Sequence, residues 1–157
     1  IFSGAAPNMS EELHDPSQLF GSIDPDAWMK VLRTNTVAPI MVAQAFQNHL
    51  AKKEGSKLAI ISSRAGSLDH IHRSGDIAYR SSKAALNCVM KCISFDFKNQ
   101  KTIVVSLNPG WIKTDMGGKN AIYSPEESAR GMRKVISGLK LENTGQFFNF
   151  DGQIVPW

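Results

Sequence analysis

Short apolar runs alternate with longer amphipathic segments along this chain. Residues 57–61 and 102–107 are largely apolar, and residues 145–150 predict a last strand that Asp151-Gly152 closes. Continuous apolar runs of this length are typical of strands buried on both faces of a parallel sheet. Ile1-Phe2 predicts the end of a further strand, which a polar loop follows to about residue 22.

Three segments between these strands carry the signals of helices. The first begins at Asp24-Pro25-Asp26, where an acidic cap precedes a proline, and extends to about residue 51. The second covers about residues 78–98, and the third begins at Ser124-Pro125 and ends near Gly138. This order predicts an α/β fold in which helices cover both faces of a parallel sheet. We expect the whole chain, residues 1–157, to form a single domain.

Polar loops follow two of the predicted strands. Ser62-Ser63-Arg64 comes directly after residues 57–61, and residues 108–116 follow the next strand. Ligands of open parallel sheets bind outside the carboxyl ends of the strands. The sequence therefore predicts a ligand site at this edge, with the Ser63 hydroxyl beside it.

The composition is that of a globular protein, with 42% hydrophobic residues, 20% charged residues and a formal net charge of +4. Lys and Arg are scattered, and short groups such as Lys52-Lys53 fall on polar helix faces, which argues against a nucleic-acid-binding protein. No apolar run approaches the ~18 residues of a membrane span, and no signal-peptide pattern opens the sequence. We therefore expect a cytoplasmic protein that binds neither nucleic acid nor membrane.

Two cysteines and two histidines invite a metal or redox interpretation. Cys88 and Cys92 lie four residues apart on a predicted helix, without a His/Asp cluster that completes a metal site. Helix geometry also holds them too far apart for a disulfide, so we expect two buried, reduced thiols. For His70 and His72 we favour a role in a substrate loop, or exposure to solvent, over catalysis or metal binding.

Tyr79 and Lys83 lie four residues apart near the start of the second helix, so they share one helix face. A free tyrosine has a pKa near ~10, and a nearby ammonium lowers it towards a useful range for proton transfer. Taken alone, the spacing occurs freely by chance, and an exposed tyrosine with a solvated lysine is the commoner outcome. Asn35 lies inside the first helix, where asparagine is a mediocre former, and it is either a tolerated polar residue or a second candidate.

Taken together, several ordered motifs resemble the second half of a short-chain dehydrogenase/reductase, and in particular its C-factor-like and Sniffer-like carbonyl reductase branch. The motifs are NTVAPI (35–40), ISSRAGSLD (61–69), AYRSSKAALN (78–87), NPGWIKTDMGG (108–118) and FFNFDGQIVPW (147–157). The resemblance covers nearly the whole chain. It implies a Rossmann-like sheet that lacks the first three strands of the doubly wound fold. It also implies an oxidoreductase that interconverts a small carbonyl compound and an alcohol with NAD(H) or NADP(H).

The resemblance assigns a role to each residue of a Ser-Tyr-Lys-Asn site. Tyr79 exchanges a proton with the carbonyl or alcohol oxygen, and Ser63 forms a hydrogen bond with that oxygen. Lys83 lowers the pKa of the tyrosine and holds the ribose of the cofactor, while Asn35 anchors a water that links Lys83 to solvent. The turn that follows the second predicted strand holds the nicotinamide. Its residues are Pro109, Gly110, Ile112 through its backbone, and Thr114 through its hydroxyl.

Features of the family's first half are not found in this sequence. None of the twelve glycines forms the Gly-x-x-x-Gly-x-Gly turn that cradles a pyrophosphate after a strand. We therefore expect weak or absent cofactor binding and impaired activity. An open sheet edge at Ile1-Phe2 predicts either part of a longer protein or a homo-oligomer that covers this edge. The alternative function is a non-catalytic signalling or interaction protein that retains the fold.

Overall fold

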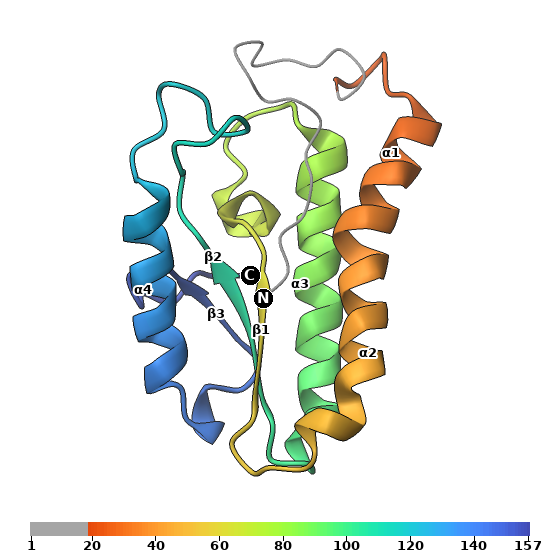
Figure 1. Ribbon diagram of the computed structural model, residues 1–157. Helices are drawn as coiled ribbons and strands as arrows, with labels where there is room; N and C mark the ends of the chain where they lie inside the picture. Colours follow the sequence, from red (N-terminus) through yellow and green to blue (C-terminus); the bar gives the residue numbers. More distant parts are fainter. Residues whose placement is uncertain (1–18) are drawn as a thin grey trace.

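Three parallel strands form the sheet of this protein, whose computed structural model describes residues 19–157 (Figure 1). Their order is β1-β2-β3, with β1 at Lys57–Ile61, β2 at Ile103–Asn108 and β3 at Gln146–Asn149. In register, Ile61 lies opposite Leu107 and Asn108 lies opposite Asn149, so the carboxyl ends of all three strands meet at one edge. The strands predicted at residues 57–61, 102–107 and 145–150 are thus confirmed to within one residue at each end. The strand end predicted at Ile1-Phe2 lies outside the described residues.

Helices cover both faces of this sheet, as the sequence predicts (Figure 1). One face carries α3 and a long helix made of three consecutive segments, and the other face carries α4. The helical segments are α1 (Pro25–Leu32), η2 (Arg33–Val37), α2 (Ala38–Leu50), α3 (Ile77–Lys98) and α4 (Pro125–Gly138). Short 3-10 helices are η3 (Arg64–Gly66), η4 (Leu68–His70) and η5 (Leu141–Asn143).

The core has two layers because neighbouring strand residues point to opposite faces. Leu58 and Ile60 pack against the layer of α2 and α3, whereas Ala59 and Ile61 pack against the layer of α4. Each large side chain that becomes fully buried contributes about 1.5–3 kcal/mol to folding. The continuous apolar run in β1 is therefore the consequence of burial on both faces.

A π-helical segment interrupts the first predicted helix at Arg33–Val37. Pro39 follows it, and a proline has no N–H to donate to the carbonyl of residue 35, four positions earlier. The backbone instead closes a wider turn, in which the Ala38 N–H donates to the Arg33 carbonyl. Such π segments occur often at functional sites, and this one contains Asn35, which is completely buried.

The two cysteines correct one prediction. Both Cys88 and Cys92 are exposed free thiols on α3, and not buried ones. The face of α3 that packs against the sheet contains Leu86 and Met90, and the cysteines lie two residues further on in each case. Two residues correspond to about 200° around a helix, so both thiols point away from the core.

Candidate active site

Ser63 and Tyr79 meet at the carboxyl end of β1. The strand delivers Ser63 in an extended conformation, where its Oγ accepts a hydrogen bond from the Ala65 N–H at 3.1 Å and caps η3. Tyr79 stands in the first turn of α3, and its side chain forms a hydrogen bond with Ser63. Two hydroxyls from segments 16 residues apart in sequence are thus side by side at the sheet edge where ligands bind.

The pKa of the Tyr79 hydroxyl is raised above its ordinary value, and burial is the largest cause. The hydrogen bond with Ser63 opposes this rise, whereas the negative charge of Asp76 adds to it. The sequence predicts the opposite net direction, from the ammonium of Lys83. That prediction is wrong for this structure because the loss of phenolate hydration outweighs an ammonium that lies 5.8 Å from the ring centre.

Lys83 is one of the most deeply buried charged side chains, with only 2% of its surface exposed. Its Nζ donates to the Ile61 carbonyl at 3.2 Å, at the end of β1. Burial lowers the pKa of Lys83 to about 8, because an ammonium loses hydration in this environment. The lysine can therefore exchange a proton at moderately alkaline pH.

Gly66 holds the segment after β1 against α3. A Cβ at this position would lie 2.5 Å from the Lys83 carbonyl carbon and 2.8 Å from the Ala84 nitrogen. Only glycine allows two backbones to come this close. The contact sets the distance between the segment that carries Ser63 and the helix that carries Tyr79.

Asn35 connects the π segment to the same turn of α3. Its Nδ2 donates to Ser82 Oγ at 3.1 Å, and Ser82 Oγ donates to the Tyr79 carbonyl at 2.7 Å. Thr36 Oγ1 adds a hydrogen bond of 2.8 Å to the Ser82 carbonyl. Asn35 Oδ1 is buried and has no hydrogen-bond partner within the described residues. It is therefore an acceptor available to a further donor.

The turn after β2 lies at the same edge of the sheet. Ser128 of α4 donates to the Pro109 carbonyl at 2.6 Å, which anchors the turn to that helix. Gly110 has a φ of +83°, and a Cβ there would lie 3.0 Å from the rings of Phe150 and Tyr123. Both the backbone conformation and the close packing thus require glycine.

Beyond Gly110 the chain runs beside Tyr123 in a parallel bridge with Ile112. The Lys113 N–H donates to the Tyr123 carbonyl, and the Trp111 carbonyl accepts from the Tyr123 N–H. In such a bridge the N–H of the middle residue points to the opposite side, so the Ile112 N–H faces away from Tyr123. Thr114 Oγ1 is exposed and accepts from the Gly117 N–H at 3.2 Å.

Asn108 is a positioning residue that the sequence analysis did not single out. Its Oδ1 accepts from the Arg64 N–H at 3.0 Å, and its Nδ2 donates to Asn149 Oδ1 at 2.7 Å. The side chain thereby joins the carboxyl ends of all three strands. The available signal was a buried strand that ends in a polar residue directly before Pro109-Gly110.

The histidines lie in the loop between Ser63 and Tyr79. His70 Nδ1 lies 3.0 Å from the buried Ser67 Oγ, and His72 is exposed. Within residues 19–157 no group of three or more His, Cys, Asp or Glu side chains is placed to hold a metal ion. Over the same residues no helix is long and apolar enough to cross a membrane.

The fold and this edge of the sheet define an α/β protein with a Ser-Tyr-Lys cluster, and comparison with known proteins identifies its family. The family model for short chain dehydrogenase matches residues 14–122. The chain is 38% identical to C-signal of Myxococcus xanthus over 87% of this chain and 82% of that protein. It therefore belongs to the short-chain dehydrogenase family of oxidoreductases.

Solved structures of carbonyl reductases have the same fold. Carbonyl reductase Sniffer of D. melanogaster superimposes with a TM-score of 0.88 at 32% identity, over 99% of this chain and 64% of that one. The NADPH-bound carbonyl reductase from chicken fatty liver superimposes with a TM-score of 0.86 at 31% identity, over 99% and 64%. An oxidoreductase of Schizosaccharomyces pombe is 38% identical over 84% of this chain and 59% of its own length. The chain thus spans about three fifths of these full-length oxidoreductases.

Proposed function

We propose that the chain carries the proton-transfer part of a carbonyl reductase active site, which interconverts a small carbonyl compound and an alcohol with NADP(H) or NAD(H). The observation that carries this proposal is the hydrogen bond between Ser63 and Tyr79 at the carboxyl end of β1, with Lys83 buried beside them. Membership in the short-chain dehydrogenase family supports the same reaction class.

In the direction of reduction, Tyr79 donates its hydroxyl proton to the substrate oxygen as negative charge develops there. The raised pKa of Tyr79 keeps it protonated at neutral pH, which suits a proton donor. Ser63 donates a hydrogen bond to the same oxygen and holds it against the tyrosine. In the reverse direction the phenolate of Tyr79, which a charged Lys83 stabilises, accepts the alcohol proton.

Lys83 and Asn35 replace the proton that Tyr79 gives up. Lys83 has a pKa of about 8 and lies at the end of β1, so it can pass a proton to the tyrosine without a large energetic barrier. The Oδ1 of Asn35, which has no hydrogen-bond partner among residues 19–157, can hold a water molecule that relays a proton. The π segment serves this role because it places Asn35 against the turn of α3 that contains both catalytic side chains.

The residues of the turn after β2 fit a nicotinamide cofactor. The Ile112 N–H faces away from its bridge partner and remains as a donor for the carboxamide, while Pro109 and Gly110 shape the turn and Thr114 presents a hydroxyl. A bound nicotinamide supplies or accepts the hydride. Lys83, together with Tyr79, can hold the adjacent ribose. A relative's structure with NADPH favours NADP(H), but the lack of a glycine-rich phosphate turn in the sequence predicts weak or absent binding by this chain.

A second candidate function is a signalling or interaction protein that retains the fold without turnover. It is favoured by the similarity to C-signal, of which this chain covers 82%, a larger share than it covers of the oxidoreductases. The open edge of β1, which pairs only with β2 among residues 19–157, favours association with a second copy of the chain. A homodimer by size-exclusion chromatography supports this association, and a monomer at all concentrations contradicts it.

The test of the proposed function compares Tyr79→Phe with Tyr123→Phe, because the chain has two tyrosines. NADPH oxidation is followed with a panel of small aldehydes and ketones at the highest usable NADPH concentration, because this chain is expected to bind the cofactor weakly or not at all. We expect slow reduction by the parent chain and by Tyr123→Phe, and a loss of about 10²–10⁴-fold in Tyr79→Phe. Equal rates in Tyr79→Phe and the parent contradict the role of Tyr79. The signalling function is favoured if no variant turns over a substrate and the Tyr79→Phe chain still produces the same cellular response as the parent.

A further inference from the structure

Asp76 occupies the residue before α3 in an unusual way. Its backbone is left-handed, with a φ of +54° and a ψ of +32°, a region that residues other than glycine enter rarely. An aspartate at a helix N-cap usually accepts hydrogen bonds from the first backbone N–H groups. The Asp76 side chain makes no such bond, so its carboxylate serves another purpose.

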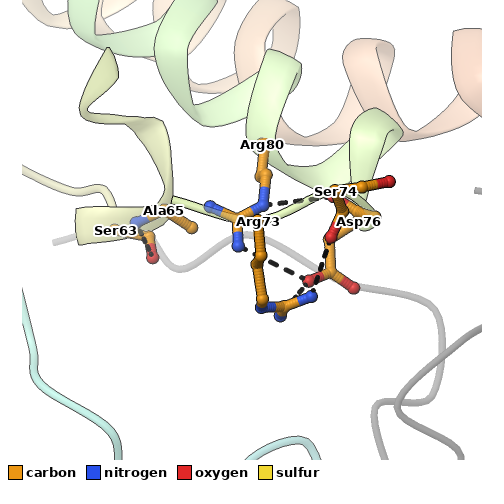
Figure 2. A network of polar contacts seen from close by, with 7 residues as sticks. Ser63, Ala65, Arg73, Ser74, Asp76 and Arg80 are labelled. Atoms are coloured by element: carbon orange, nitrogen blue, oxygen red, sulfur yellow. Dashed lines mark hydrogen bonds and ion pairs between the residues drawn. The ribbon is translucent and has the colours of Figure 1, made fainter. Parts of the chain in front are cut away.

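The carboxylate is held between two arginines, one before it and one after it in sequence (Figure 2). Asp76 Oδ2 accepts from an Arg73 guanidinium nitrogen at 2.6 Å and lies 3.8 Å from a guanidinium nitrogen of Arg80. Each arginine also binds the loop backbone: Arg73 donates to the Ser74 carbonyl and Arg80 Nε donates to the Gly75 carbonyl, both at 3.1 Å. The cluster therefore fastens residues 73–76 to the first turn of α3.

This cluster differs from an ordinary surface ion pair in its burial. The side chains of Asp76 and Arg80 are only 17% and 15% exposed, whereas those of the pair between Lys101 and Glu54 are 58% and 61% exposed. Exposed pairs contribute little because water and salt screen them. A largely buried carboxylate with two cationic partners holds its geometry more firmly, which makes it suitable for fixing a neighbouring group.

The neighbouring group is Tyr79, which lies one turn further along α3. The negative charge of Asp76 contributes to the raised pKa of the tyrosine hydroxyl. Polar groups near this tyrosine include Ser63 and the ammonium of Lys83. Of the elements packed against α3, α1 presents the indole of Trp28 to Ser81 and η2 presents an amide and a hydroxyl to Ser82, while the side chain of the η3 residue Arg64 is exposed. Within residues 19–157, Asp76 supplies the negative charge that raises the pKa of Tyr79.

We propose that Asp76, clamped between Arg73 and Arg80, is a positioning residue that holds the Tyr79 hydroxyl against Ser63. The clamp fixes the left-handed residue at which the loop enters α3, and so it sets the direction in which the first turn presents the tyrosine. The inference rests on the proposed function of Tyr79 as the proton donor. The inference states that the contact between Tyr79 and Ser63 depends on Asp76. This dependence, called the coupling below, can be measured without substrate or turnover.

The experiment reads the ionisation of Tyr79 directly in the full 157-residue chain. Tyr123→Phe leaves a single tyrosine, which is replaced biosynthetically by 3,5-difluorotyrosine, since fluorination makes the hydroxyl more acidic and gives one ¹⁹F signal to titrate. In this background Ser63→Ala removes a hydrogen bond that lowers the tyrosine pKa, so we expect the titration to shift to higher pH. The same shift is then measured after Asp76→Asn, which keeps the shape and tolerates the left-handed backbone.

The proposal predicts that the effect of Ser63→Ala is clearly smaller in the Asp76→Asn chain, because the tyrosine is no longer held against Ser63. Loss of the Asp76 charge also changes the tyrosine pKa directly. This change is the same in the Asp76→Asn chain with and without Ser63→Ala, so it cancels when the two titrations are subtracted. Asp96→Asn is the matched control: it removes the same charge from the same helix, about 25 Å from Tyr79 at 1.5 Å per residue, and the full shift should remain.

If Ser63→Ala shifts the tyrosine titration equally in the parent and in the Asp76→Asn chain, the proposal is overturned. If Asp76→Asn does not fold, Arg73→Met gives the same comparison, because that side chain is 48% exposed and its loss is tolerated more easily. A reduced coupling in a chain that binds NADPH but reduces no carbonyl compound upholds the positioning role and contradicts only the proposed reductase activity. An unchanged coupling in an active chain does the reverse, so the two failures are distinguishable.

Discussion

The backbone of Gly66 lies directly against the backbone of Lys83, close enough that a Cβ on the glycine would stand 2.5 Å from the lysine carbonyl carbon. This contact joins the segment that follows β1 to the N-terminal third of α3. Asn87 strengthens it, because its Nδ2 lies 3.4 Å from the Gly66 carbonyl. The separation of Ser63 from Tyr79 is therefore set by backbone packing as well as by their own hydrogen bond.

Gly66→Ala should destabilise the chain and disturb the site together. The added methyl group meets backbone atoms that cannot rotate away, and overpacking of this kind costs about 1–3 kcal/mol. Urea unfolding followed by circular dichroism measures the free energy of unfolding. Gly138→Ala is the control: a Cβ there meets no atom within 4 Å, and alanine favours a helix over glycine by up to about 1 kcal/mol. Equal stability of the parent and Gly66→Ala contradicts the close packing.

Lys83→Met should change how stability depends on pH. Burial holds the folded-state pKa of Lys83 at about 8, below the unfolded value of 10.5. Between these pH values the unfolded chain binds more protons, so the free energy of unfolding of the parent rises with pH. The difference corresponds to a penalty on the order of 3 kcal/mol that is fully present below pH 8.

In Lys83→Met this rise should be absent, and the variant should be more stable than the parent at neutral pH, by less than that penalty because the hydrogen bond to Ile61 is lost. The comparison is read between pH 8 and 10, since the raised pKa of Tyr79 makes the free energy of unfolding fall again above the ordinary tyrosine pKa of 10.0. Denaturant titrations at several pH values provide the measurement. If the free energy of unfolding depends on pH in the same way in the parent and in Lys83→Met, the result counts against a buried ammonium.

Both cysteines should react rapidly with an aromatic disulfide reagent in the folded chain, because Cys88 and Cys92 are exposed. Their rates should approach those in urea, where burial no longer protects any thiol. Single Cys→Ser variants assign each phase to one residue. Strong protection of either thiol in the folded chain, relieved only by urea, shows that another surface covers this face of α3.

The hydrophobic pattern, together with the capping, proline and glycine residues at the ends of elements, predicted the layers of the fold correctly. Each long element carries such a signal in its own sequence. The acidic cap at Asp24 and the capping box of Ser124 with Glu127 define helix starts in the structure as they do in the sequence. The π segment was not predicted, although its cause was visible in Pro39. A proline inside a helical pattern indicates a disturbed turn, but only the packing against α3 decides which kind of turn forms.

Ser63, Tyr79 and Lys83, which the sequence offers as candidates, lie close together in the structure, but the direction of the tyrosine pKa differs from the expected one. Spacing alone places Tyr79 and Lys83 on one face, but it contains no information on burial, which reverses the expected direction of the tyrosine pKa. Asn108 and Asp76 were missed for a related reason. Each acts through contacts with segments that are near only in the folded chain, or through a side chain that turns away from its usual capping role.

One measurement tests the central claim that Tyr79 is the proton donor of a carbonyl reductase site. The N-terminal segment of the fly Sniffer chain, which we expect to carry a glycine-rich phosphate turn, is joined in front of this chain to supply the turn that none of its twelve glycines forms. The fusion should bind NADPH and reduce a carbonyl substrate, Tyr123→Phe should leave the rate nearly unchanged, and Tyr79→Phe should lower kcat by about 10²–10⁴-fold with little loss of NADPH binding. A fusion that binds NADPH but reduces no carbonyl, or one in which Tyr79→Phe is as active as the parent, contradicts the claim.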